Sequence, residues 1–204
     1  MFPYKILPIL TLLVGVCFGD PLPESGPCSC AVIKKSGGWC PECKLGYLAG
    51  VRVTSRFFFE MLDAHGHDLD LTALQCPTCK KNATDGGYCD DCRIGFHKKK
   101  AYFTRLTYEF AQGVIVERET LPCDDCHKCP ELIHWCERCG KGLLGNILIS
   151  SKQDFEIARK EFERFLTALR MLPTCEGCAV AYFMRSLCPK CRKSWDGDEP
   201  AKKD

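Results

Sequence analysis

Residues 76–92 read CPTCKKNATDGGYCDDC and hold two close cysteine pairs, Cys76 with Cys79 and Cys89 with Cys92, nine residues apart. The same spacing recurs twice toward the C-terminus, at Cys123, Cys126, Cys136 and Cys139 and at Cys175, Cys178, Cys188 and Cys191. A copy with a shorter opening pair lies near the N-terminus, at Cys28, Cys30, Cys40 and Cys43. Sixteen of the 18 cysteines therefore belong to four copies of one pattern, which indicates an array of similar units.

Each copy supplies four thiols, a donor set that fits a tetrahedral metal site. Structural Zn²⁺ is held by four thiolates at about 2.3 Å each, and CxxC pairs on either side of a short connection are typical of such sites. We therefore expect four structural Zn²⁺ ions, one in each copy. The missing residue between Cys28 and Cys30 leaves open whether the first copy forms a complete site.

Two further positions recur in the first three copies. An aromatic residue precedes the third cysteine: Trp39, Tyr88 and Trp135. A glycine lies three residues after the last cysteine: Gly46, Gly95 and Gly142. We expect the aromatic side chain to cover one side of the site and the glycine to allow a sharp turn after the CxxC pair, because glycine adopts unusual backbone angles at little steric cost.

Residues 76–92 and the segment SGGWCPEC at residues 36–43 resemble small zinc ribbons of the CPxC…(aromatic)CxxC type, including tandem zinc ribbons. The resemblance is confined to the four cysteine copies. It implies zinc bound structurally in modules that contact proteins or nucleic acids. It therefore supplies a fold and a cofactor but no particular function.

Residues 1–19 have the pattern of a secretory signal peptide. They contain one positive charge at Lys5, an apolar run from Ile6 to Val16, and small residues before Asp20. The run is shorter than a membrane-spanning helix requires. We expect an exported protein of the periplasm, cell envelope or extracellular space, with no transmembrane span in the mature chain. The alternative is a membrane anchor, through this segment or through a lipid on Cys17.

Export favours disulfides, so eight disulfide bonds are the main alternative to metal. The fixed spacing, repeated four times, favours metal, and iron or another thiophilic ion is the third possibility. Cys129 forms a competing CxxC with Cys126, but the constant nine-residue gap favours Cys123 as the ligand. We expect His127 and His134 to be surface residues, because each copy already has four sulfurs.

Apolar residues between the copies recur at helical spacing. We expect a helix starting at Thr54 or Ser55, a second that carries Tyr102, Phe103, Leu106 and Phe110 and ends at Gly113, and a third from Ser151 to Pro173. A short strand is predicted at residues 114–116.

The predicted fold is a small, metal-dependent α+β array of four tandem zinc-ribbon units, each followed by a helix. Its segments are a signal peptide (1–19), unit 1 (20–75), unit 2 (76–122), unit 3 (123–174), unit 4 (175–195) and a disordered tail (196–204).

Charge argues against a nucleic-acid partner. Sixteen thiolates and four Zn²⁺ would change the formal net charge from +2 to about −6, whereas a nucleic-acid binder needs a basic face. The basic run at residues 97–100 is read as a solvated helix start.

Catalysis also lacks a basis in the sequence. No nucleophile stands next to a base, and a zinc ion with four sulfur ligands has no open position for water. His65 and His67, with Asp68 and Asp70, are read as a polar loop rather than a metal site.

The expected function is that of an exported, non-enzymatic zinc-binding repeat protein, a structural or protein-interaction module. Two alternatives stay open. The first is a thiol-disulfide redox protein or disulfide scaffold. The second is a metal buffer or metallochaperone, because sixteen thiolates can store or deliver ions.

Overall fold

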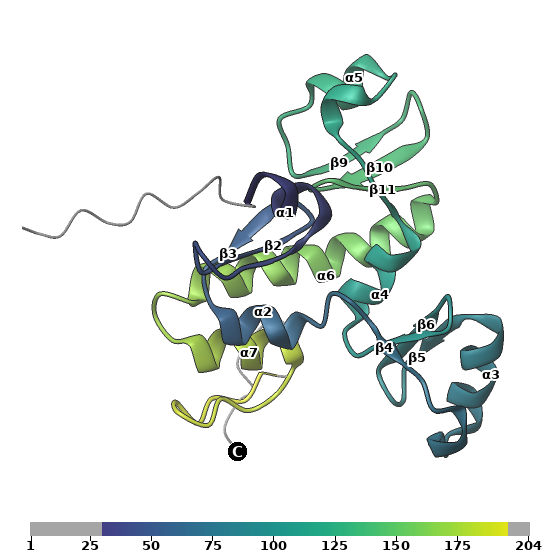
Figure 1. Cartoon of the computed structure of the whole chain (residues 1–204), viewed down its shortest axis with the longest axis vertical. Coiled ribbons are helices and arrows are strands. Elements are labelled where there is room, and N and C mark those ends of the chain that lie inside the picture. The colour runs from purple at the N-terminus through teal and green to yellow at the C-terminus, as the bar shows by residue number, and fades with distance from the viewer. Residues whose placement is uncertain (1–29, 196–204) are drawn as a thin grey trace, which may run out of the picture.

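The computed structural model describes residues 30–195, which form a small mixed α+β fold with cysteine groups arranged in tandem (Figure 1). The predicted signal peptide at 1–19, Cys17, Cys28 and the predicted tail at 196–204 lie outside the described residues. Within residues 30–195, no helix is both long enough and apolar enough to span a membrane.

Three consecutive segments share one order of elements: a short helix, three strands and a second helix. The first contains α1 (Cys30–Ser36), β1 (Gly38–Cys40), β2 (Leu45–Leu48), β3 (Val51–Val53) and α2 (Arg56–Leu62). The second contains α3 (Pro77–Asp85), β5 (Gly87–Cys89), β6 (Ile94–His97), β7 (Lys100–Tyr102) and α4 (Arg105–Gln112). The third contains α5 (Asp124–Lys128), β9 (Ile133–Cys136), β10 (Lys141–Leu144), β11 (Ile147–Ile149) and α6 (Lys152–Met171).

The fourth cysteine group is built differently. Its helix α7 (Glu176–Met184) is followed by a turn with one isolated bridge, between Leu187 and Ser194. Two short 3₁₀ helices, η1 (Leu71–Ala73) and η2 (Arg118–Thr120), lie in the connections between the units.

All strand pairs in the three sheets are antiparallel. Two sheets gain an edge strand from the preceding connection: β4 (His67–Asp68) pairs with β7, and β8 (Val114–Ile115) pairs with β11. The predicted strand after Gly113 is therefore present. The register places the aromatic residue before the third cysteine opposite the repeated glycine: Trp39 with Gly46, Tyr88 with Gly95, and Trp135 with Gly142.

The second helix of each segment begins at a hydroxyl cap. The caps accept the backbone N–H three residues on: Ser55 from Phe58 (2.9 Å), Thr104 from Thr107 (3.2 Å) and Ser151 from Asp154 (3.3 Å). Each such cap stabilises its helix by about 1 kcal/mol. The predicted starts at Ser55 and Ser151 are confirmed. The prediction for the middle helix was wrong at its start, because Tyr102 lies on β7 and the helix begins only after Thr104.

The reason predicted for the repeated glycines was also wrong. Gly46, Gly95 and Gly142 lie within central strands and not at turns. The sharp turn is made by the residue directly after the last cysteine, which has a positive φ in all four groups: Lys44 (52°), Arg93 (57°), Gly140 (64°) and Arg192 (52°).

The glycines instead make room for an aromatic ring that lies thirteen residues later in each copy: Phe59, Tyr108 and Phe155. A Cβ at Gly142 would stand 2.1 Å from Cδ2 of Phe155. The same ring contacts the aromatic residue before the third cysteine, with Trp135 and Phe155 centroids 5.4 Å apart. In each segment, the aromatic ring on the helix therefore packs against both the strand glycine and the aromatic residue before the third cysteine, and this contact joins the sheet to the helix.

We predict that Gly142→Ala destabilises the protein by about 1–3 kcal/mol, because the added methyl overlaps the Phe155 ring. Chemical denaturation would measure the loss. The control is the double variant with Phe155→Leu. In that background the smaller side chain should relieve much of the Gly142→Ala effect, whereas simple additivity of the two changes would contradict a direct clash.

One hydrophobic core joins the units, and α6 passes through its middle (Figure 1). Phe162 of α6 contacts Phe110 of α4, with ring centroids 5.7 Å apart. Phe58 of α2 contacts Phe165 of α6 and Phe183 of α7, at 6.2 and 5.8 Å. Helices from all four cysteine groups therefore pack together, and the units share one hydrophobic core.

Candidate metal centres

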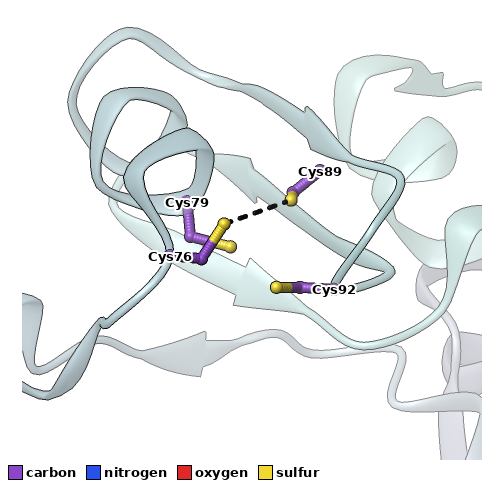
Figure 2. A group of neighbouring side chains, drawn as sticks. All are labelled: Cys76, Cys79, Cys89 and Cys92. Atoms are coloured by element: carbon purple, nitrogen blue, oxygen red, sulfur yellow. Dashed lines mark hydrogen bonds between the residues drawn. The ribbon is translucent and has the colours of Figure 1, made fainter.

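Three complete cysteine quartets come together in the described residues, and in each the four sulfur atoms lie within 4.8 Å of one another. The quartets are Cys76, Cys79, Cys89 and Cys92; Cys123, Cys126, Cys136 and Cys139; and Cys175, Cys178, Cys188 and Cys191. Figure 2 shows the first of these, in which the pair at the start of α3 faces the pair at the end of β5 and the turn after it. These groups are positioned to bind metal ions.

Sulfur–sulfur distances match a tetrahedral ion. Four thiolates bound at about 2.3 Å to one ion stand about 3.8 Å apart, whereas a disulfide needs about 2.05 Å. The distances between opposite pairs are 3.9 Å for Cys76–Cys89, 3.7 Å for Cys123–Cys136, 3.5 Å for Cys126–Cys139 and 3.6 Å for Cys175–Cys191. These distances are too long for disulfides and are compatible with four sulfurs around one metal ion.

The first cysteine of each complete quartet lies at the N-cap of a short helix: Cys76 before α3, Cys123 before α5 and Cys175 before α7. These helices were not predicted. In the fourth group, the N–H of Cys178 donates to Cys175 Sγ and the N–H of Cys191 donates to Cys188 Sγ, both at 3.4 Å. Backbone N–H groups thus point at the sulfurs and favour their thiolate form.

Each quartet contains one thiol with a lowered pKa and another with a raised pKa. The backbone N–H three residues on lowers the pKa of one thiol in each: Cys76 to about 7, Cys136 to about 6 and Cys175 to about 7. Burial raises the pKa of a second thiol in each: Cys79, Cys126 and Cys178. A buried thiol ionises only with a compensating positive charge, which a divalent cation supplies.

In the first group, the structure brings together Cys30, Cys40 and Cys43, whose sulfurs also lie within 4.8 Å of one another. Cys30 begins α1, Cys40 ends β1, and Cys43 lies in the turn that follows. The fourth predicted ligand, Cys28, is outside the described residues.

The choice of Cys123 over Cys129 agrees with the structure, because the quartet gathers around Cys123. Cys129 lies at the C-cap of α5, where its carbonyl accepts a hydrogen bond from the Arg118 guanidinium. His127 is exposed on α5 and His134 is half-buried on β9. Neither histidine belongs to the third quartet.

One cluster was missed from the sequence. His65 and His67 were grouped with Asp68 and Asp70, but the structure brings Asp63 to them instead. Asp70 caps η1 and accepts the N–H of Thr72 at 2.9 Å, and hydrogen bonds from Thr72 lower the pKa of Asp70. The signal in the sequence was the alternation Asp-x-His-x-His directly after a predicted helix.

No protein-family model matches the chain, and searches of curated proteins and of solved structures give no significant match. The assignment of function therefore rests on the donor sets, distances and packing of the described residues.

Proposed function

We propose that this protein is an exported, non-enzymatic zinc protein in which four Zn²⁺ ions hold rigid units that present surfaces to a protein partner. The observation that carries the proposal is the sulfur spacing of 3.5–3.9 Å between opposite cysteine pairs. Cys28 is the fourth ligand of the first site in this proposal. The units are zinc-ribbon-like, each with its own cysteine centre.

Closed four-sulfur sites support a structural role for the ions. A Zn²⁺ ion with four protein ligands keeps no position for water or substrate. The third cysteine of the first, second and fourth groups is fully buried: Cys40, Cys89 and Cys188. An ion in such a site stabilises the fold around it, and in small zinc-finger peptides this stabilisation is about 10–16 kcal/mol.

The common core supports the scaffold role. Small cysteine lobes built on α3 and α5 project from the body around α6 (Figure 1). Tyr88 beside the α3 site packs on Tyr108 of α4, and Trp135 beside the α5 site packs on Phe155 of α6, so both lobes are attached to helices of that body. A fixed array of surfaces suits the binding of a protein more than the rapid release of ions, which favours an interaction module over a metal buffer.

A redox role is the competing class. In a thiol-disulfide enzyme the two sulfurs of one CxxC must reach each other and exchange with a substrate. Here all four sulfurs of a quartet gather within 4.8 Å of one another, and Cys76 lies 3.9 Å from Cys89 of the opposite pair. This arrangement favours metal over exchange.

Native mass spectrometry of the chain from Asp20 onward, purified without reductant, tests the proposal. We expect four bound Zn²⁺, thiols that are all alkylated after denaturation, and loss of the circular dichroism signal on chelation. Oxidised cysteines without metal would establish a disulfide or redox protein instead. Ions that pass to a weak chelator within seconds would establish a metal buffer.

Partner binding needs a separate comparison. Cross-linking in the exporting host, with intact and chelated chain, should recover a protein that only the metal-loaded chain retains. Equal recovery by both forms would contradict a role for the zinc-held units in recognition.

A further inference from the structure

Asp63 and His65 lie at the end of α2 and on the turn after it, His67 begins β4, and all three are outside the cysteine groups. Oδ1 of Asp63 is 2.5 Å from Nε2 of His67 and 4.0 Å from Nε2 of His65. The three donor atoms lie within 4.8 Å of one another. Two imidazole nitrogens and one carboxylate oxygen form a donor set that binds Zn²⁺ and other first-row divalent ions.

The backbone around this cluster is held at several points. Asp63 ends α2 with a φ of 55° and donates its N–H to the carbonyl of Glu60. Gly66 has a φ of 64°, and a Cβ there would stand 2.8 Å from the Tyr102 ring. His67 then enters β4, where it pairs with Ala101. The two histidines are therefore presented by a turn with little freedom, which is what a preorganised site requires.

The carboxylate of Asp63 is oriented by a second contact. Its side chain is only 9% exposed, and Oδ2 accepts the N–H of Phe103 at 3.1 Å. This bond keeps Oδ1 directed at the histidines, as outer hydrogen bonds do for metal-binding carboxylates. The His67 ring packs against Phe103, with centroids 5.0 Å apart.

The histidines themselves can be reached from solvent. Their side chains are 76% exposed for His65 and 45% for His67. His65 also lines a cavity of about 460 Å³ between α1, α2, α4 and β11, together with Glu60 and Tyr102. An ion held by only three protein donors would thus keep coordination positions open toward water or the cavity.

We propose that Asp63, His65 and His67 form an open site for a divalent first-row cation, distinct in donors and accessibility from the cysteine centres. Asp63 supplies an oriented oxygen and the histidines supply Nε2 atoms. Binding would replace the Asp63–His67 hydrogen bond by two bonds to the ion. The site does not depend on the proposed function, because it shares no ligand with the quartets.

The test is a titration of the untagged full chain with Ni²⁺ after saturation with Zn²⁺ and removal of free ions. Ni²⁺ accepts imidazole and carboxylate ligands but competes poorly for tetrahedral thiolate sites that already hold zinc. Calorimetry should give one binding event per chain. His65→Asn and His67→Asn should each weaken it by at least about 10-fold, the scale on which even outer-shell partners act.

The matched control is Asp68→Asn. Asp68 is adjacent in sequence and pairs with Lys100 at 3.5 Å, but it is not part of the cluster. It should leave the affinity unchanged. His65→Asn is the decisive variant, because this exposed side chain can be replaced without unfolding the chain; equal Ni²⁺ affinity in wild type and His65→Asn would overturn the proposal.

A second readout separates this site from the quartets. In long-range ¹H–¹⁵N spectra of the zinc-loaded chain, the Nε2 signals of His65 and His67 should shift when a further equivalent of Zn²⁺ is added. Unchanged signals would contradict the site. A chain whose quartets fail to hold zinc would contradict the proposed function, while the difference between wild type and His65→Asn would still report on this cluster.

Discussion

Cys126→Ser is expected to remove one bound ion and to unfold the cysteine lobe built on α5. Cys129→Ser is expected to change neither the number of bound ions nor the folding of this lobe. Cys126 is 2% exposed and its sulfur lies 3.5 Å from that of Cys139. A serine hydroxyl does not replace a buried thiolate ligand. Structural zinc contributes about 10–16 kcal/mol to the folding of small zinc fingers. The binding free energy lost with the ion is therefore larger than the free energy of unfolding expected for a lobe of this size.

The two cysteine variants form a matched pair, because both change sulfur to oxygen within the helix α5 or at its cap. Native mass spectrometry would count the ions, and amide hydrogen exchange of β9 and β10 would report on the lobe. The expected result is three ions and lost protection for Cys126→Ser alone. Loss of an ion and of protection in Cys129→Ser alone would mean that Cys129 is a ligand. The nine-residue spacing between cysteine pairs would then not identify the ligands of this site.

Phe162→Ala is expected to destabilise the whole protein by about 3–5 kcal/mol. The Phe162 side chain is fully buried on α6, with ring contacts to Phe110 and Phe165 at 5.7 and 5.8 Å. Truncation would leave a cavity where helices from two units meet. Since one core joins all units, a single unfolding transition should move to lower denaturant concentration.

Phe57→Ala is the control for this prediction. Phe57 lies on α2, but its side chain is 52% exposed, so its truncation should cost less than about 1 kcal/mol. Denaturation followed by circular dichroism and by tryptophan fluorescence would measure both variants. If Phe162→Ala shifted only one of several separate transitions, the units would be independent and the shared core would not govern stability.

The features predicted correctly from the sequence depend on residues that are close together in the chain. Ser151 begins its helix because its hydroxyl accepts the N–H of Asp154, three residues away. The choice of Cys123 over Cys129 follows from a spacing, and the structure places Cys123 in the quartet. The start of α4 was missed because the strand β7 extends to Tyr102, and strand pairing overrides the local apolar pattern there.

The repeated glycines recur because an aromatic ring packs directly over each of them. The cysteine repeat predicts Gly46, Gly95 and Gly142 as recurring positions but does not predict the residues that contact them. An aromatic ring thirteen residues later recurs in the same three copies, so the signal was present. Its meaning required a helix folded back on the sheet, because only that contact brings ring and glycine together.

The sequence by itself determined the four cysteine groups, the mixed α+β class and the caps of the helices after the first and third groups, because each depends on spacing over a few residues. Only the tertiary structure decided that the units share one core and that Asp63 faces the histidines. The Phe103 N–H that orients Asp63 lies 40 residues away in the chain. Such contacts depend on how separate elements pack, and local spacing carries no information about that packing.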